Sequence, residues 1–309
     1  MPILKLEPVL KDFIWGGKKL KKLFNRKSDS NIAESWELSV HNAGESVIQN
    51  GEFQGKTLTA YIKSNPDCLG EITELPILIK YLDANSNLSV QVHPDDNYSR
   101  KYENDNGKTE MWYVISAEKN SGIYCGLNKD ITKDEFVNLI NQNEIESVLN
   151  FIPVRAGDCY LIEAGTLHAI CKGVVICEVQ QSSNVTYRVY DYGRVGADGK
   201  PRQLHIEKAI EVSKLTKFAD NTKTENFKKF DGGKIRLLTK CKYFKCYEVL
   251  CQEKYSFKNN SSFSAINIIK GDGIINKIKF TSGDTFFVPC GEKVVIEGKA
   301  KIVLSAQNN

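Results

Sequence analysis

The residues best suited to chemistry lie at positions 88–96 and at Glu110, which ends a following Gly-Lys-Thr-Glu segment. Alternate side chains of a strand point to opposite faces, so one face of this stretch would carry polar groups. The apolar face would carry Leu88, Val90 and Val92, and the polar face Ser89, Gln91 and His93. After a short polar loop, Glu110 adds a carboxylate. An inward amide, imidazole and carboxylate predict a ligand, and we expect a divalent metal.

The chain has only four histidines, at positions 41, 93, 168 and 205. A single histidine is more often a satisfied structural residue than a ligand. Two of them have a suggestive context: His93 shares a strand face with Gln91, and His168 ends a Gly-Thr-Leu-His turn that can aim its ring into a barrel mouth. With Glu110 these residues offer two nitrogens and two oxygens. This donor set suits zinc or another borderline divalent ion and leaves positions open for a substrate.

Composition is that of a soluble globular protein, with 309 residues, 41% apolar and 26% charged. The 42 basic and 38 acidic residues leave a net charge of +4. This is too small to predict nucleic acid as a partner. The nine cysteines form no CxxC pair, and we find neither a signal peptide nor an apolar run long enough for a membrane span. We expect a cytoplasmic protein without a membrane partner.

Short alternating runs separated by glycine-rich turns predict a mainly β fold. We expect strands at 77–82, around 155–158, around 163–168, at 174–181 and at 186–190. Helical spacing predicts short helices at 57–63 and 206–212. A helical insertion at about 129–151 would contain a helix that begins at the capping box Thr132–Glu135 and a second helix from Asn143.

Composition shifts to lysine, asparagine, aspartate and threonine between residues 216 and 233, which predicts a domain boundary. We therefore expect a metal-binding domain at 1–230 and a smaller β domain at 231–309. Because the second part contains no histidine, we expect no metal chemistry there.

Several motifs together resemble those of the type I mannose-6-phosphate isomerases, in their shorter bacterial form. The strongest are Gln-Val-His-Pro-Asp-Asp at 91–96, Gly-Lys-Thr-Glu at 107–110, Gly-Thr-Leu-His-Ala at 165–169, Glu-Val-Gln-Gln-Ser-Ser at 178–183 and Tyr-Arg-Val-Tyr-Asp at 187–191. Shorter matches lie at 14–17, 34–37 and 204–206. The resemblance covers roughly residues 5–215 with the motifs in the expected order.

This resemblance implies a cupin-type β-barrel, or jelly roll, with a helical insertion and a second cupin-like β domain. It implies an isomerase of carbohydrate metabolism that interconverts mannose 6-phosphate and fructose 6-phosphate with one Zn²⁺ per chain. The partner would be the hexose phosphate itself. A monomer and a homodimer both stay open.

Carried over position by position, the resemblance makes Gln91, His93, Glu110 and His168 the zinc ligands. It places Lys108 and Ser89 against the sugar or its phosphate, and Arg188 as the active-site arginine. Glu163 stands where the family pattern has proline. It is either a turn variant or a third carboxylate near the metal.

The implied reaction moves a proton between two carbons through a cis-enediolate, whose negative charge a Lewis acid would stabilise. Arg188 would add a permanent positive charge. Lys108 could hold a phosphate or, if desolvated, transfer a proton. The base stays open among Lys108, water ordered by Arg188, and Glu163.

Competing interpretations exist for the same residues. Glu110 could be a strand-edge charge, Arg188 and Asp191 could form a structural ion pair, and Trp112 could be core. At the level of the whole protein, one alternative is a regulatory cupin that binds a sugar phosphate without catalysis. Another is a metal-dependent oxygenase, because two histidines and a carboxylate also suit iron.

Overall fold

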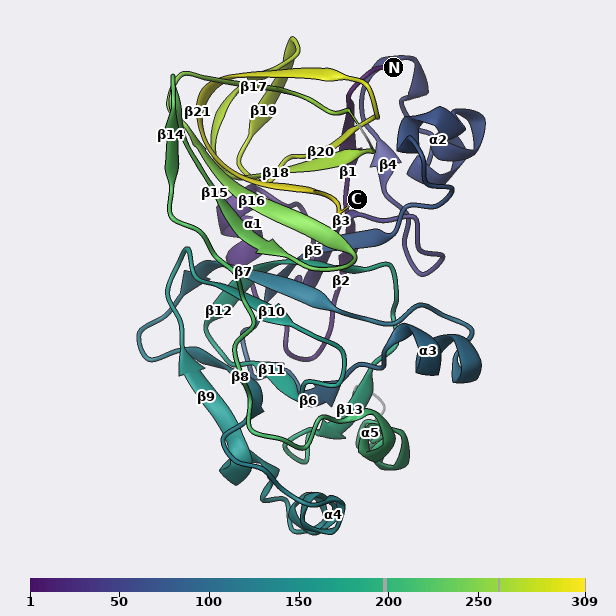
Figure 1. The fold of residues 1–309 in the computed structure, drawn as a ribbon, viewed down its shortest axis with the longest axis vertical. Helices are drawn as coiled ribbons and strands as arrows, with labels where there is room; N and C mark the ends of the chain where they lie inside the picture. Colours follow the sequence, from purple (N-terminus) through teal and green to yellow (C-terminus); the bar gives the residue numbers. More distant parts are fainter. Residues whose placement is uncertain (197–198, 261, 309) are drawn as a thin grey trace.

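The computed structural model describes residues 1–196, 199–260 and 262–308, which form three antiparallel sheets arranged in two lobes (Figure 1). The mainly β architecture predicted from the sequence is confirmed. In Figure 1 the upper lobe carries the C-terminal strands, and the lower lobe carries the segments that contain the predicted metal ligands.

The upper lobe is a ten-stranded sheet. Its main path runs β14 (Lys228–Phe230), β15 (Gly233–Lys240), β16 (Phe244–Cys251), β21 (Lys293–Gln307), β18 (Ser264–Ile275), β20 (Thr285–Val288), β1 (Leu4–Glu7) and β4 (Val47–Ile48). The strands β17 (Lys254–Lys258) and β19 (Ile278–Thr281) pair with β21 and β18. The N-terminal β1 and β4 thus belong to a C-terminal sheet. The domain boundary at residue 230 stays a prediction. Strands from both sides of this boundary belong to the same ten-stranded sheet.

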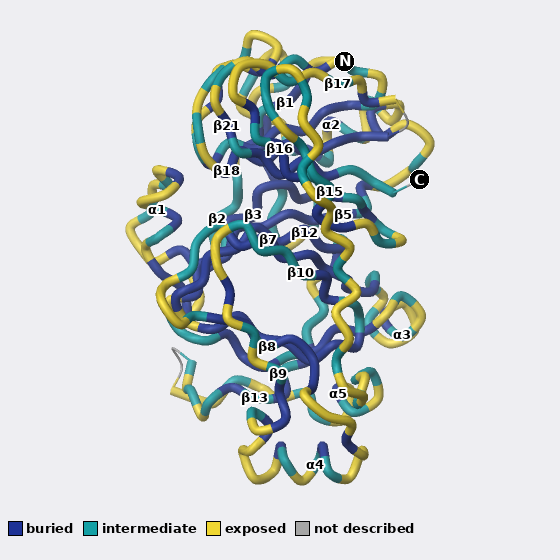
Figure 2. Tube along the Cα trace, turned by 60° about the vertical axis from the view of Figure 1, so that its left-hand side comes forward, coloured by how far each residue is buried: buried dark blue, intermediate teal, exposed yellow. Residues whose placement is uncertain are grey.

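The lower lobe contains two sheets that face each other. One runs β10 (Cys159–Ile162), β7 (Glu110–Ala117), β12 (Val174–Gln181), β5 (Ile77–Asp83), β3 (Glu34–Leu38) and β2 (Val9–Lys11). The other runs β13 (Tyr187–Tyr190), β6 (Val90–Val92), β11 (His168–Ile170), β8 (Gly122–Leu127) and β9 (Leu149–Pro153). Figure 2 shows both as largely buried chain on opposite sides of this lobe.

Helices lie at the outside. The α-helices are α1 (Lys19–Phe24), α2 (Leu58–Ser64), α3 (Asp96–Tyr102), α4 (Lys133–Asn141) and α5 (Ile206–Val212), and the 3₁₀ helices are η1 (Gly51–Phe53), η2 (Pro66–Leu69) and η3 (Ile145–Val148). None of the helices in the described ranges is long and apolar enough to cross a bilayer.

The helical insertion is confirmed, but its second half is shorter than expected. The Thr132 hydroxyl accepts from the Glu135 backbone N–H at 3.1 Å, which caps α4. Asn143 adopts a left-handed φ of 59° and separates α4 from η3, which is a single 3₁₀ turn. The second helix predicted from Asn143 is therefore present only as this turn, over Ile145–Val148.

The polar loop predicted after the first motif is also wrong, because α3 occupies it. The Asp95 carboxylate accepts from the Tyr98 N–H at 2.9 Å and caps this helix. The aspartate at position 95 was the sequence signal for the start of this helix. The polar residues that follow it are also typical of a loop, so the helix was not predicted.

In residues 88–96, side chains alternate between the two faces of a strand only within β6. Leu88 lies outside this strand and packs in a cluster with Trp15 and Trp112, while Val90 and Val92 pack in a different one. The expectation that these three residues share a face fails for Leu88. Likewise, residues 155–158 and 163–167 are largely turns, and the strands begin at Cys159 and His168.

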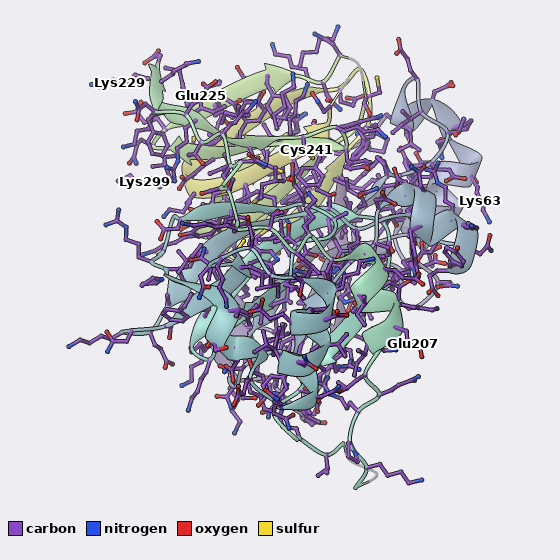
Figure 3. All side chains as sticks on the ribbon, turned by 60° about the horizontal axis from the view of Figure 1, so that its bottom comes forward. Lys63, Glu207, Glu225, Lys229, Cys241 and Lys299 are labelled. Atoms are coloured by element: carbon purple, nitrogen blue, oxygen red, sulfur yellow. The ribbon has the colours of Figure 1, made fainter. Side chains whose placement is uncertain are left out.

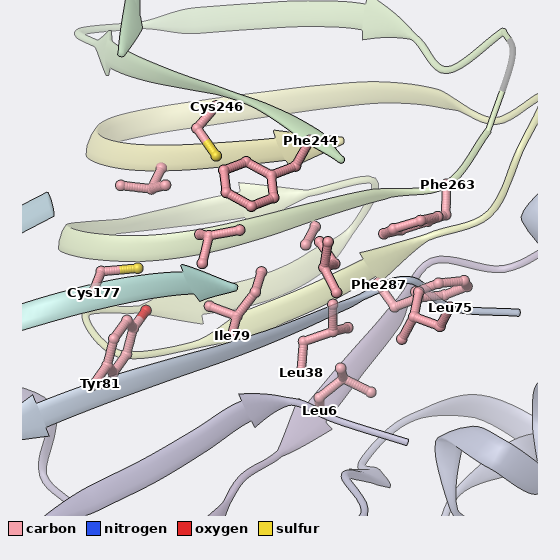
Figure 4. Packing of buried hydrophobic residues seen from close by; sticks show 14 of the residues in the cluster. Leu6, Leu38, Leu75, Ile79, Tyr81, Cys177, Phe244, Cys246, Phe263 and Phe287 are labelled. Atoms are coloured by element: carbon pink, nitrogen blue, oxygen red, sulfur yellow. The ribbon is translucent and has the colours of Figure 1, made fainter. Parts of the chain in front are cut away.

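The largest buried cluster joins the two lobes. Figure 4 shows Ile79 and Cys177 from the six-stranded sheet facing Phe244 and Phe287 from the ten-stranded sheet. Charged side chains such as those labelled Lys63, Glu207, Lys229 and Lys299 project from the outline in Figure 3. A continuous core across both lobes predicts that they unfold together.

We predict that Phe287→Ala lowers the free energy of unfolding by about 3–5 kcal/mol, because it leaves a cavity in a closed core. Phe287 is fully buried and its ring lies 5.8 Å from that of Phe263. Urea denaturation would measure the change. Phe151→Ala, at a side chain that is 45% exposed, is the control and should shift stability by less than about 0.5 kcal/mol.

Candidate metal centre and adjoining cavity

Strand register brings three of the predicted site residues together. Gln91, in the middle of β6, pairs with His168 of β11 on one side and with Arg188 of β13 on the other. His93 follows directly after β6. Residues nearly a hundred positions apart therefore meet because β6 lies between β11 and β13.

The carboxylate comes from the opposite sheet. Glu110 begins β7, and its oxygens lie 3.6 Å from His93 Nε2 and 3.4 Å from His168 Nε2. One ligand atom from each of these three buried residues lies within 4.8 Å of the other two. Zinc holds nitrogen and oxygen ligands at about 2.0–2.2 Å, so this spacing suits one shared ion.

Hydrogen bonds fix the tautomer of both imidazoles. His93 Nδ1 donates to the Val185 carbonyl and His168 Nδ1 to the Thr166 carbonyl, each at 2.8 Å. Since a carbonyl only accepts, each Nε2 keeps its lone pair and faces the cluster. Burial lowers the pKa of His168 to about 4, and burial with the nearby Lys108 ammonium lowers the pKa of His93 well below its usual value. Both rings are neutral at pH 7, as metal ligands must be.

Glu110 tests whether these residues fit a metal. Its side chain is fully buried, and within the described ranges neither carboxylate oxygen has a hydrogen-bond partner. Lys108 Nζ forms an ion pair with Oε2 at 2.8 Å and also lies 2.9 Å from His93 Nε2. A buried carboxylate without donors is costly unless a cation balances it. The residues fit a divalent ion.

Gln91 adjoins the cluster. Its amide nitrogen lies 3.2 Å from His168 Nε2. A flip of the amide would turn the carbonyl oxygen, a zinc-compatible donor, toward the same point. Direct ligation by Gln91 stays a prediction.

A cavity of about 320 Å³ opens beside the cluster. The predicted residues Ser89, Gln91, Lys108 and Arg188 all line it. The remaining lining residues are Phe13, Trp15, Glu34, Lys80, Leu82, Leu88, Ile170, Glu178, Asn184, Thr186 and Arg202. A polar cleft of this size suits a small, charged substrate.

Arg188 does not pair with Asp191, so the structural ion pair considered from the sequence is wrong. Asp191 instead forms ion pairs with Arg194 and Arg202. Arg202 Nε donates to Asp191 Oδ2 at 2.7 Å. Arg188 donates to the Gln203 carbonyl at 2.7 Å, and its buried Nε has no partner in the described part of the chain. Burial and the charge of Arg202 lower the pKa of Arg188, but the guanidinium stays ionised at any ordinary pH.

Sequence reasoning missed Glu178 and Lys80 as site residues. They are paired neighbours on β12 and β5, and both line the cavity. Burial and then the Glu110 charge raise the pKa of Glu178 to about 6. Charged residues in strands buried along their whole length were the available signal. Trp112, which donates to Glu178 Oε2 at 2.9 Å, is 1% exposed and belongs to the core as expected.

Glu163 lies away from the cluster. Its carboxylate pairs with Lys214 at 3.0 Å on the surface and does not line the cavity. Of the two alternatives for this residue, the contacts support the turn variant.

Two family models match parts of the chain. A family model described as "Phosphomannose isomerase type I, catalytic domain" matches residues 3–126, and one described as "Mannose-6-phosphate isomerase, cupin domain" matches residues 234–307. The second confirms the expected cupin fold.

Full-length relatives point the same way. The chain is 38% identical over 312 residues to the probable mannose-6-phosphate isomerase GmuF of Bacillus subtilis, covering 98% of both chains. It is 35% identical to the mannose-6-phosphate isomerase of Streptococcus mutans, covering 96% of this chain and 95% of that one. The crystal structure of mannose 6-phosphate isomerase from B. subtilis superposes with a TM-score of 0.94 at 33% identity, over 99% of this chain and 100% of that one. The chain therefore belongs to the type I mannose-6-phosphate isomerase family.

Proposed function

We propose that this enzyme is a zinc-dependent aldose–ketose isomerase that interconverts mannose 6-phosphate and fructose 6-phosphate, with one ion held by His93, Glu110 and His168. The observation that carries the proposal is the buried Glu110 carboxylate, whose oxygens have no hydrogen-bond partner among the described residues and face two neutral imidazoles beside a polar cavity. We assign Gln91 as a further oxygen ligand. Membership of a family with a catalytic-domain model supports catalysis over the regulatory alternative.

Zinc, when bound, would supply a Lewis acid that stabilises negative charge on the substrate oxygens as the carbon-bound proton leaves. The cavity walls would strengthen this effect. Trp15, Leu82, Leu88 and Ile170 contribute apolar surface, which excludes water and lowers the local dielectric.

The phosphate would bind at the positively charged side of the cavity. Arg188 offers a buried Nε that has no partner in residues 1–196, 199–260 and 262–308, and Arg202 is held in place by Asp191. Guanidinium groups match phosphate oxygens in a bidentate way. Ser89 and Lys108 would add a hydroxyl and a second charge.

Proton transfer fits Glu178 better than Lys108. Burial alone would lower the pKa of Lys108, but the carboxylates of Glu110, Glu178 and Glu34 raise it, so the ammonium keeps its proton. The Glu178 pKa of about 6 suits a group that accepts and returns a proton near neutral pH. We assign Lys108 to charge stabilisation and Glu178 to proton transfer.

A reducing compartment fits the sulfur chemistry. All nine cysteines are free thiols. We therefore propose the cytoplasm as the location and carbohydrate metabolism as the role, with the sugar phosphate as partner rather than nucleic acid or a membrane, in a monomer or homodimer.

Metal removal is the first test. We predict that dialysis against a chelator abolishes isomerase activity and that zinc restores it. Metal analysis should find one zinc per chain. Full activity in the chelated protein would contradict the proposal, and oxygen uptake with iron but no isomerisation would favour the oxygenase.

We predict that Arg188→Ala raises the KM for mannose 6-phosphate about 10- to 100-fold, because one charge-assisted contact to phosphate is lost. Steady-state kinetics would measure this. Arg155→Ala, at a side chain that is 90% exposed, is the matched control. Unchanged kinetics in Arg188→Ala would remove the role of this residue but not the reaction.

We predict that kcat/KM, measured with saturating zinc, falls about tenfold per pH unit on the acidic side of its pH profile, because Glu178 must be ionised to accept a proton. Glu178→Gln should lose at least about 100-fold in kcat, while the exposed Glu207→Gln should match the parent enzyme. Parent-level activity in Glu178→Gln would refute the assignment.

A further inference from the structure

Asp96, the first residue of α3, receives hydrogen bonds from three distant segments. Its Oδ1 accepts from the Gly107 backbone N–H at 3.0 Å and from Gln181 Nε2 at 2.8 Å. Its Oδ2 accepts from the Tyr243 hydroxyl at 3.1 Å. The neighbouring Asp95, not Asp96, caps α3. The Asp96 carboxylate is therefore committed to these contacts.

Gln181 continues the network to the residue before Glu110. The Gln181 side-chain oxygen accepts from the Thr109 N–H at 2.8 Å, and the Gln181 N–H donates to the Thr109 carbonyl at 3.0 Å. Gln181 is 4% exposed, so water does not compete strongly for these groups. Asp96 and Gln181 thus hold the backbone on both sides of Lys108.

The segment 107–109 has little freedom to move within this network. A side chain at Gly107 would approach the Asp96 backbone nitrogen to 2.4 Å, so only glycine fits there. The Lys108 N–H also donates to the Pro94 carbonyl at 3.0 Å. The segment is therefore pinned against the chain that follows His93.

Tyr243 brings the other lobe into this arrangement. It lies in the turn between β15 and β16 of the ten-stranded sheet. Lys242 Nζ lies 3.9 Å from Asp96 Oδ2, but its side chain is 79% exposed, and such a contact contributes little. The hydroxyl of Tyr243 is the directed contact from this turn to Asp96.

The position of the Glu110 carboxylate depends on the segment that precedes it. Glu110 is the first residue of β7, and the ammonium that pairs with its Oε2 at 2.8 Å belongs to Lys108 of the same segment 107–109. Residues that orient a metal ligand from outside its coordination sphere can alter metal affinity substantially.

We propose that Tyr243 and Asp96, acting through Gln181, are positioning residues for the metal centre. Through them, the ten-stranded sheet of the upper lobe would raise the zinc affinity of the site in the lower lobe. This inference rests on the proposed zinc site at His93, Glu110 and His168. Neither Tyr243 nor Asp96 belongs to the metal cluster or lines the cavity.

The test measures the zinc Kd of the full-length protein by competition with a chromogenic chelator. Tyr243→Phe removes only the hydroxyl, and we expect it to raise the Kd about threefold to tenfold. Asp96→Ala should raise it about 10- to 100-fold. Asp96→Asn, which keeps an acceptor for Gly107 and Gln181, should lie closer to the parent protein.

Tyr255→Phe is the matched control. Tyr255 lies in β17 of the same sheet and contacts the rings of Phe230 and Phe257. It has no contact with Asp96 or the segment 107–109. We expect Tyr255→Phe to leave the zinc Kd unchanged.

The double variant Asp96→Ala with Tyr243→Phe decides whether Tyr243 acts through Asp96. If it does, the second substitution adds no further loss of zinc affinity. Additive losses, or a zinc Kd for Tyr243→Phe equal to that of Tyr255→Phe, would overturn the inference. Should Asp96→Ala fail to fold, the comparison of Tyr243→Phe with Tyr255→Phe decides alone. Failure of the parent protein to bind zinc would instead overturn the proposed function.

Discussion

The buried carboxylate of Glu110 is the constraint on which the site depends. Glu110 is fully buried, faces His93 and His168, and has no hydrogen-bond donor in the described part of the chain. Taking a carboxylate out of water costs several kcal/mol unless a cation compensates it. The Lys108 ammonium supplies one positive charge, at 2.8 Å. A divalent ion would bind the Glu110 carboxylate and the Nε2 lone pairs of both imidazoles at one point, which is why we assign a metal here.

The two facing sheets of the lower lobe make this arrangement possible. The imidazoles lie at the ends of two adjacent inner strands of one sheet, and Glu110 is the first residue of a strand in the other. One apolar cluster contains residues of both sheets, such as Trp112 of β7 and Ile170 of β11, so the gap between the sheets is set by packing rather than by the ligands. The cluster is in this sense preorganised, and a bound ion would need little rearrangement of the backbone.

Charge is divided between the walls of the cavity. Glu34, Lys80 and Glu178 line the side formed by the six-stranded sheet, and Arg188 and Arg202 line another. An isomerase acting on a sugar phosphate needs both kinds of surface, because the phosphate is anionic while proton transfer requires a basic group. The hydrogen bonds that reach from Tyr243 to the segment before Glu110 connect this chemistry to the upper lobe.

The sequence by itself determined the residue types of the site and their local setting. The motif around His93, the turn before His168 and the strand at Val174–Gln181 could all be predicted, because alternation and turn chemistry act over a few residues. Family likeness extended this prediction to Lys108 and Arg188. The helix α3 and the outlying position of Leu88 were missed, because capping competes with a polar loop and alternation ends with the strand.

Only the tertiary structure decided which distant groups meet. Sheet order places Gln91 between His168 and Arg188, and burial raises the pKa of Glu178 to about 6. The tertiary structure also pairs Asp191 with Arg202 and brings the Tyr243 hydroxyl of the upper lobe to Asp96 of the lower lobe. Strand pairing and burial depend on the packing of the whole chain, so no local pattern could have specified them.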